Sequence, residues 1–301
     1  MKKVNIDNIE NATFCNTLAT ELNLTKNTVF NPTFKIAFDS FINEIGAEYE
    51  LKDKVLQDIK NYSFYENVLT ENEYTKVIEK NNRELRIEVS FNKELPFQKP
   101  SRISEEPLIF EGEKLCHFKP RILPNLLYYK NEDDFAISLI PCDESQEIIM
   151  VKSPFPPNTS FDDIFHTLQQ NKRQKSVDFN AEIKIPIIEL DWTTNHPEIE
   201  NRILEKSPFD FWHIIEIDEG LNFSLTNTGA KLEAYHKLEG VWNCVVPEQP
   251  HKIIFDKPFM IFLKKEGIST PYFAAYIADP TFLRPFDLAE IKKENKTIDG
   301  F

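Results

Sequence analysis

Two pairs of adjacent acidic residues are the first candidates for chemistry in this chain. Asp133-Asp134 and Asp218-Glu219 have the residue types that hold a divalent cation or exchange protons in acid–base catalysis. Adjacent residues of a β-strand point to opposite faces, so such a pair does not by itself converge on one ligand. Acidic surface turns are the competing interpretation, and we expect it to hold for both pairs.

The histidines and cysteines lack the spacing of a metal or catalytic site. The six histidines show no i, i+4 pairs, and the four cysteines show no C-x-x-C spacing. No G-x-S-x-G, H-E-x-x-H, P-loop or G-x-G-x-x-G pattern occurs. We therefore predict no enzyme, no cofactor and no metal site. Core or surface roles are expected for His117, His166, His196, His213, His236, His251, Cys15, Cys116, Cys142 and Cys244.

Charge and hydropathy argue against several classes of partner. The formal net charge of −14 predicts repulsion of nucleic acid and anionic lipid, and the cluster of Lys172, Arg173 and Lys175 is too small to offset it. No segment resembles a membrane span, and polar residues follow Lys2 and Lys3 where a signal peptide needs an apolar run. We expect a cytoplasmic protein, or a secreted one whose signal peptide has been removed.

Helices dominate the predicted N-terminal part. With 301 residues, of which 41% are hydrophobic, the chain can bury a substantial core. Apolar residues recur at helical spacing over 14–22, 34–45 and 51–59, which predicts three helices. The middle helix is the clearest, since Thr33 is a possible N-cap and Gly46 stands where a C-cap glycine is expected.

Strands dominate the rest of the sequence. Alternating apolar and polar residues predict strands over 85–91 and 177–185, and a further short strand is expected over 135–140. One further helix is predicted over 161–171, where Ser160 can act as the N-cap. Helices first, and then strands interrupted by an isolated helix, indicate an α+β architecture with mostly antiparallel sheets.

The strongest β signal lies near the C-terminal end of the sequence. Apolar runs at 259–263 and 272–280 flank a polar turn that contains Gly267, which predicts a buried hairpin. No internal repeat and no Gly/Ser linker divides the chain, so we expect residues 1–301 to form a single domain.

This C-terminal region resembles the last strands of serpins, in which a Phe and a Pro-Phe pair precede a buried hairpin. Here those positions are Phe255, Pro258 and Phe259. Other segments match serpin motifs in the same order along the chain. They are Asn27–Pro32, Phe34–Ala47, Leu95–Phe110, Phe135–Pro141, Phe161–Leu168, Pro186–Ile188 and Ala230–Gly240, the last being similar to the strand that leads into the reactive-loop hinge.

The resemblance implies a fold and a mode of action. The fold would be serpin-like, with N-terminal helices packed on a large, mostly antiparallel central sheet and smaller C-terminal β-sheets. The mode of action would be protein–protein contact without catalytic residues or cofactor. Two departures stand out: the stretch from Glu66 to Arg83 is too short for the helices and strand that serpins carry there, and the reactive-loop region is short.

The shortened loop bears on inhibition, because the cleaved loop of an inhibitory serpin slides into the central sheet as a new strand. Counted from Val241 to Lys252, twelve residues reach at most roughly 40 Å. Pro247 and Pro250 would remove ladder donors, and Trp242 would overpack the core at a cost of roughly 1–3 kcal/mol. The predicted partner-binding loop consists of Val241, Trp242, Asn243, Cys244, Val245, Val246, Pro247, Glu248, Gln249 and Pro250.

Three hypotheses about function remain. The first is a non-inhibitory serpin-like protein that acts by protein–protein interaction through this loop. The second is a serine or cysteine protease inhibitor that offers Val245 or Val246 to its target. The third is an unrelated α+β binding domain or hydrolase whose strands imitate the serpin pattern.

Overall fold

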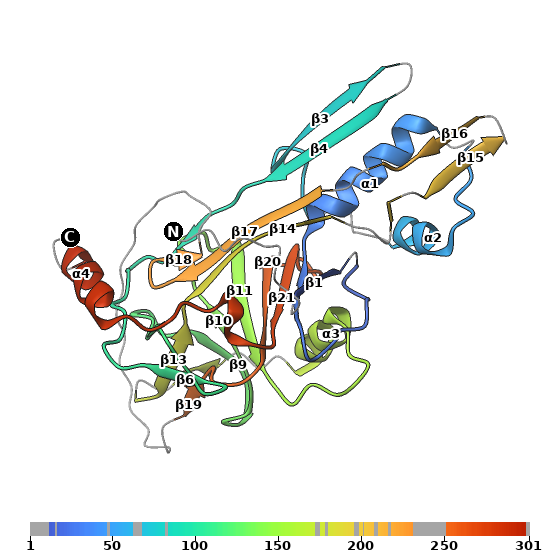
Figure 1. Cartoon of the computed structure of the whole chain (residues 1–301). Helices are drawn as coiled ribbons and strands as arrows, with labels where there is room; N and C mark the ends of the chain where they lie inside the picture. The colour runs from blue at the N-terminus through green and yellow to red at the C-terminus, as the bar shows by residue number, and fades with distance from the viewer. Residues whose placement is uncertain are drawn as a thin grey trace.

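The computed structural model has an α+β fold, in which separate helices accompany mostly antiparallel sheets (Figure 1). The structure describes residues 12–15, 17–46, 49–62, 68–81, 84–171, 175–177, 180–195, 199–200, 202–207, 210–215, 218–230 and 251–298. The predicted α+β class, with a large and mostly antiparallel sheet, is confirmed.

The largest sheet has eight strands in the order β1-β2-β21-β20-β11-β10-β9-β12. β1 pairs with β2 in parallel, and the other neighbouring strands are antiparallel. The bounds are β1 Ala12–Cys15, β2 Asn27–Phe30, β9 Asn125–Asn131, β10 Asp134–Leu139, β11 Gln146–Lys152, β12 Lys175–Ser176, β20 Phe259–Lys265 and β21 Phe273–Ile277. β20 and β21 confirm the predicted C-terminal hairpin.

Both faces of this sheet are buried. On one face, helix α3 (Phe161–Asn171) packs Phe161 and Phe165 against Phe262 of β20, with ring centroids 6.0 and 5.3 Å apart. On the other face, Phe135 and Ile261 belong to a larger core shared with the smaller sheets. Because no face is left to solvent, the central strands are continuous apolar runs rather than alternating ones.

Two smaller sheets adjoin the large one. The three-stranded sheet has the order β19-β13-β8, and the four-stranded sheet has the order β14-β17-β18-β5. The chain passes from β13 to β14 through the single residue Ile187, so the two sheets share a junction there. The bounds are β5 Leu95–Pro96, β8 His117–Phe118, β13 Glu182–Pro186, β14 Ile188–Asn195, β17 Asp218–Thr226, β18 Gly229–Ala230 and β19 Lys252–Ile254.

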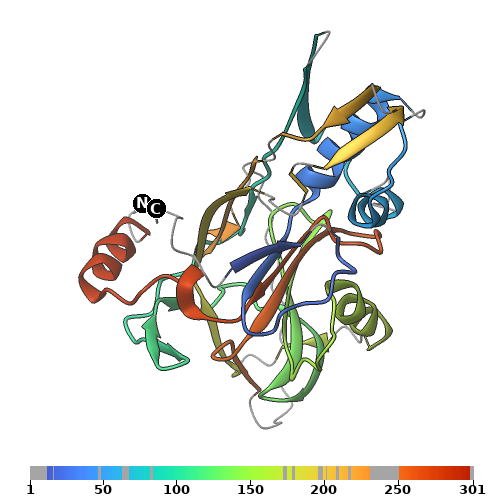
Figure 2. The same cartoon turned by 45° about the vertical axis from the view of Figure 1, so that its right-hand side comes forward.

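Three two-stranded hairpins complete the described sheets. They are β3 (Tyr74–Lys80) with β4 (Leu85–Phe91), β6 (Leu108–Phe110) with β7 (Glu113–Leu115), and β15 (Ile203–Ser207) with β16 (Asp210–His213). The β3–β4 hairpin extends away from the body of the molecule (Figures 1 and 2). The sequence predicts β4 but not β3, whose residues are almost all exposed and therefore lack a clear apolar pattern.

The predicted helices at 34–45 and 51–59 are present as α1 (Pro32–Ile45) and α2 (Lys54–Asn61). Asn31, rather than the predicted Thr33, caps α1, since its side chain accepts a hydrogen bond from the Thr33 N–H. α1 and α2 share a separate apolar cluster with the β15–β16 hairpin.

The helix predicted over 14–22 is wrong. Residues 12–15 form strand β1 instead, and the chain from 17 to 26 consists mainly of turns. Leu18 and Leu22 are buried as the helical spacing suggests, but they pack in the cluster that contains Phe161 and Phe165 of α3. The strand predicted over 177–185 is also shorter, because β13 begins only at Glu182.

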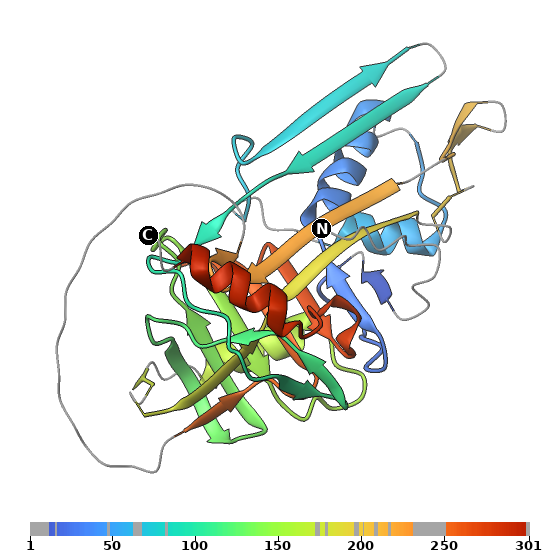
Figure 3. The ribbon, with the colours of Figure 1, turned by 60° about the vertical axis from the view of Figure 1, so that its left-hand side comes forward.

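After β21 the chain forms a short 3-10 turn (Pro280–Phe282) and then helix α4 (Leu288–Ile298). α4 lies on the opposite side of the molecule from α1 and α2 (Figures 1 and 2). Figure 3 shows α4 in red on the near side of the molecule. The sequence patterns considered above did not predict this helix.

Candidate functional site

The predicted partner-binding loop, Val241–Pro250, lies outside the described residues, as do His236 and Cys244. The described chain nevertheless defines where the connection that contains this loop begins and ends. Ala230 is the last described residue before it, and His251 is the first one after it. We therefore describe the candidate site through its two anchors, the paired segments of chain that precede and follow this connection.

The first anchor is a tight reversal after β17. Thr226 ends β17, and β18 runs back antiparallel to it, with Ala230 opposite Leu225. Asn227 in the turn forms two hydrogen bonds with Ser101. Its side chain donates to the Ser101 carbonyl at 2.7 Å, and its backbone carbonyl accepts from the Ser101 N–H at 2.8 Å. These bonds fix the direction in which the chain leaves β17.

Gly229 makes this reversal possible. Its φ of 132° is unfavourable for any residue with a side chain, and a Cβ at this position would lie 2.5 Å from the Leu95 carbonyl oxygen. The close approach arises because β18 lies between two strands, pairing with β17 on one side and with Leu95–Pro96 of β5 on the other. Ala230 is fully buried in this position.

The second anchor is strand β19. It pairs in parallel with β13, so that Lys252 lies opposite Glu182 and Ile253 opposite Ile183. The buried Lys152 fixes its far end by donating to the Ile254 carbonyl at 2.9 Å and to the Asp256 carboxylate at 2.6 Å. The connection thus returns to a strand whose backbone is held on two sides.

The second anchor corrects one boundary expected from the sequence, since Lys252 belongs to β19 rather than to the loop. The chain reverses at 227–228, so that Gly229 and Ala230 pair with β17. Residues 231–240, which the sequence places in the strand leading into the hinge, lie outside the described residues. The span between the paired residues Ala230 and Lys252 is roughly twenty residues, with a maximal reach of about 70 Å.

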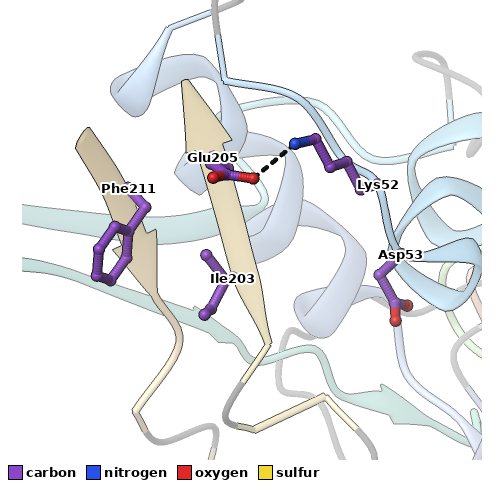
Figure 4. A pocket seen from close by; sticks show the side chains of 5 residues that line it. All are labelled: Lys52, Asp53, Ile203, Glu205 and Phe211. Carbon is purple, nitrogen blue, oxygen red and sulfur yellow. Dashed lines mark hydrogen bonds and ion pairs between the residues drawn. The ribbon is translucent and has the colours of Figure 1, made fainter. Parts of the chain in front are cut away.

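An open pocket of about 490 Å³ lies between the residues that precede α2 and the β15–β16 hairpin (Figure 4). Ile203 and Phe211, about half exposed at 48% and 51%, form its apolar part. The Lys52 ammonium lies 2.6 Å from the Glu205 carboxylate at its polar end. No sequence motif indicated this pocket, because its lining comes from segments about 150 residues apart in the chain.

Lys52 and Asp53 of the pocket are stabilised in their charged forms. The hydrogen bond and charge of Glu205 raise the pKa of Lys52, so the ammonium stays protonated. Burial opposes ionisation of Asp53, but hydrogen bonds from the Leu56 N–H and from Arg202 outweigh it and lower its pKa.

Both residues of the acidic pair at 133–134 form ion pairs with lysines. Asp133 lies 2.7 Å from Lys257 and 3.0 Å from Lys152, and these hydrogen bonds lower its pKa. Asp134 pairs with Lys130 at 2.9 Å. Asp218 and Glu219 begin β17, and their side chains lie outside the described part. Among the described residues, no three histidine, cysteine or acidic side chains gather in a way that could hold a metal ion.

The described histidines do not converge on one site. His117 is buried in β8 with an unpaired Nδ1, and burial together with the charge of Lys184 lowers its pKa to about 4. The His251 ring contacts Tyr129 at a centroid distance of 4.6 Å. Cys15 and Cys116 are buried, as expected of core thiols. His196 lies outside the described residues.

The tryptophans of this chain differ in what the structure describes of them. Trp212 is partly buried and makes an edge contact with Phe41, at 6.2 Å between ring centroids, so it contributes to packing. Trp242 lies outside the described residues, and for Trp192 the structure describes the strand but not the side chain. Of the helices that the structure describes, none has the length and apolar character needed to cross a membrane.

No protein-family model and no curated protein matches the sequence. Among solved structures, the chain is similar to human thyroxine-binding globulin complexed with its hormone (TM-score 0.46, 13% identity, 67% of this chain and 58% of that chain). It is also similar to a serpin from the trematode Schistosoma haematobium (TM-score 0.43, 11% identity, 67% and 58%). A third match is a highly specific serpin from the insect Tenebrio molitor (TM-score 0.39, 12% identity, 66% and 57%). The chain spans a little over half the length of these structures.

Proposed function

We propose that this protein is a non-catalytic, serpin-like binding protein that contacts a protein partner through residues 241–250 of the connection between β18 and β19. The observation that carries the proposal is the fixation of both anchors. Ala230 is buried between β17 and β5, and Ile253 is buried beside β13. A segment tied at both ends to packed strands loses less conformational entropy on binding than a free tail.

The composition of the segment supports a contact role. Trp242, Val245 and Val246 supply apolar area, and Pro247 and Pro250 restrict the backbone. The proposal needs no catalytic group, which agrees with the paired state of Asp133, Lys52 and Asp53 described above.

One observation favours protease inhibition as the second candidate. β18 already occupies two ladder positions between β17 and β5, where an inserted loop strand would begin. Continued in register, residues 231–237 would extend along β17 as far as Asp218, before Trp242 or either proline is reached. The overpacking argument from Trp242 therefore does not apply to the first part of an insertion.

Side-chain size still favours the first candidate. In the same register, residue 232 would lie opposite Phe223 on the buried face of the sheet, and that residue is Leu232. Position 236 on the same face is His236, whose burial without a partner is costly. The serpin mechanism relies on small residues at such positions, and of the next inward positions only Ala234 is small.

A panel of serine and cysteine proteases separates the two candidates. We expect cleavage or no reaction, but no covalent complex that survives denaturing electrophoresis. Such a complex, linked at Val245 or Val246, would make inhibition the function of this chain.

Binding itself is tested with a variant in which 241–250 is replaced by a Gly/Ser segment of equal length. Both proteins are immobilised and exposed to extract from the native host, and bound proteins are identified after cross-linking. We expect the specific partners to be lost from the variant. The control replaces the exposed residues Asn81 and Glu84, which flank the β3–β4 connection, with Ser, and it should keep the partners. Partners retained by the 241–250 variant would contradict the proposal.

A further inference from the structure

The segment from Phe282 to Ile298, here called the strap, crosses from the end of β21 to the outside of the smaller sheets. It contains the end of the 3-10 turn, an extended stretch and helix α4. Its extended part pairs with two separate segments of the chain: Leu115 lies opposite Pro285, and Ile188 lies opposite Leu283. The strap therefore contacts both β7 and β14.

Arg284 is at the centre of these contacts. Its N–H donates to the Ile187 carbonyl at 2.9 Å, and its carbonyl accepts from the Cys116 N–H at 2.9 Å. The Ile187 N–H in turn donates to the Cys116 carbonyl at 3.0 Å. Three backbone segments thus meet at Ile187, the residue through which the chain passes from β13 to β14.

Two side chains of α4 dock the helix on the body. Ile291 is fully buried. Asn295, also buried, accepts from the Ile103 N–H at 3.0 Å and donates to the Ile103 carbonyl at 2.9 Å, which satisfies both groups of one backbone residue. Because an isolated helix of 11 residues is only marginally stable in water, α4 depends on this docking.

The Arg284 guanidinium connects the two parts of the strap. It donates to both carboxylate oxygens of Glu294 and lies 3.2 Å from Glu290, and both residues are on α4. It also lies 4.0 Å from Glu189 of β14. Only 13% of its side chain is exposed, so this ion-pair group is partly shielded from solvent. Docking of α4 and attachment of the strap to the junction are thereby linked.

The junction at Ile187 connects the two sheets that contain the anchors of the connection. The four-stranded sheet holds Ala230, and the three-stranded sheet holds Lys252. These residues are the two anchors of the connection described above. Whatever fixes the junction also fixes the position of one anchor relative to the other.

We propose that the strap is a conformational lock on the sheet junction at Ile187. Docked, it holds the three-stranded sheet against the four-stranded sheet; released, it lets the junction open locally while the large sheet stays folded. Any effect of this lock on partner binding, through the relative position of the two anchors, rests on the proposed function. The lock itself does not.

Amide hydrogen exchange of the intact protein, without any partner, tests the lock. The variant Asn295→Leu keeps the approximate size of the side chain but removes both hydrogen bonds to Ile103. We expect exchange at Ile103, Cys116 and Arg284 to accelerate about tenfold or more, and exchange at Ile187 to accelerate by a similar factor. Exchange at these amides should depend less on denaturant than exchange at Ile149 in the centre of β11, since Ile149 reports on global unfolding, which exposes more surface.

Lys293→Ala is the matched control, because Lys293 is exposed on the same helix and should leave every one of these rates unchanged. The milder Ile291→Val, which shortens a buried side chain of the same helix, is a second variant for which we expect the same pattern. Acceleration at Arg284 without acceleration at Ile187 would overturn the proposal. Unchanged rates at all strap amides in both variants would overturn it too. Because no partner is present, these outcomes are independent of whether the 241–250 binding experiment succeeds.

Discussion

Gly229 fixes the first anchor of the connection through the absence of a side chain. A Cβ at this position would lie 2.5 Å from backbone atoms of Leu95 and Pro96, and the φ of 132° adds backbone strain. We expect Gly229→Ala to lower the free energy of unfolding by roughly 2–4 kcal/mol, as measured by urea denaturation.

Gly267→Ala is the matched control for this substitution. Gly267 also has a positive φ, of 75°, but a Cβ there would meet no heavy atom within 4 Å. The control should therefore lose only about 1–2 kcal/mol from backbone strain. Equal losses in the two variants would show that β18 does not lie as close to β5 as described.

His117 makes stability depend on pH. Burial and the charge of Lys184 lower its pKa to about 4 in the folded state, whereas the unfolded side chain keeps a value near 6.5. Between these values the unfolded chain binds a proton that the folded chain does not, so stability falls as pH decreases from 6.5 to 4. The full loss is on the order of 3 kcal/mol.

Urea denaturation at a series of pH values, compared with His117→Gln, checks this prediction. The variant removes the titrating group, so the free energy of unfolding should change less steeply with pH between 4 and 6.5. The difference in slope should correspond to about one proton bound on unfolding. Identical slopes in the two proteins would mean that His117 titrates normally in the folded state.

Capping of α3 is the element-scale feature that the sequence predicts in most detail. The Ser160 Oγ accepts from the Asp163 N–H at 3.1 Å, and the Asp163 carboxylate accepts from the Ser160 N–H at 2.9 Å. We expect Ser160→Ala to cost about 1 kcal/mol of stability, measured by thermal denaturation. Gln170→Ala, at an exposed position of the same helix, should change stability by less than about 0.5 kcal/mol. A cost no larger than that of the control would exclude a capping role.

Elements with local signals were predictable from the sequence. α1, α2, α3 and β4 each have their own apolar period, and the β20–β21 hairpin consists of two continuous apolar runs around a turn with Gly267. The helix expected over 14–22 was wrong, because Phe14, Leu18 and Leu22 match a helical spacing only by coincidence. Their burial comes from pairing with β2 and from packing beneath α3, which are contacts between distant segments.

The candidate site was less predictable than the fold. The sequence places a partner-binding loop at 241–250, and those residues lie outside the described chain. It does not indicate the reversal at 227–228, which depends on hydrogen bonds between Asn227 and Ser101, residues more than a hundred positions apart. Nor does it indicate the pocket at Lys52, whose partner Glu205 is on another hairpin.

At the scale of the whole molecule, the two anchors and the strap belong to one arrangement. The sheets that hold Ala230 and Lys252 meet at Ile187, and the strap pairs with the chain at that residue. The connection between the anchors is long enough to reach along β17, so its length does not prevent insertion into the sheet. In the proposed account, insertion is opposed by the size of Leu232 and His236, which would face inward if the register of β18 continued. A measurement on the cleaved chain tests this.

That measurement is the thermal unfolding midpoint of the chain before and after a single cleavage within 241–250. We predict that the cleaved protein melts within about 3 °C of the intact one, because the cleaved segment does not become a strand. A rise of roughly 10 °C or more, with new hydrogen-exchange protection at residues 231–237, would show that the segment has inserted beside β17 and would contradict the account.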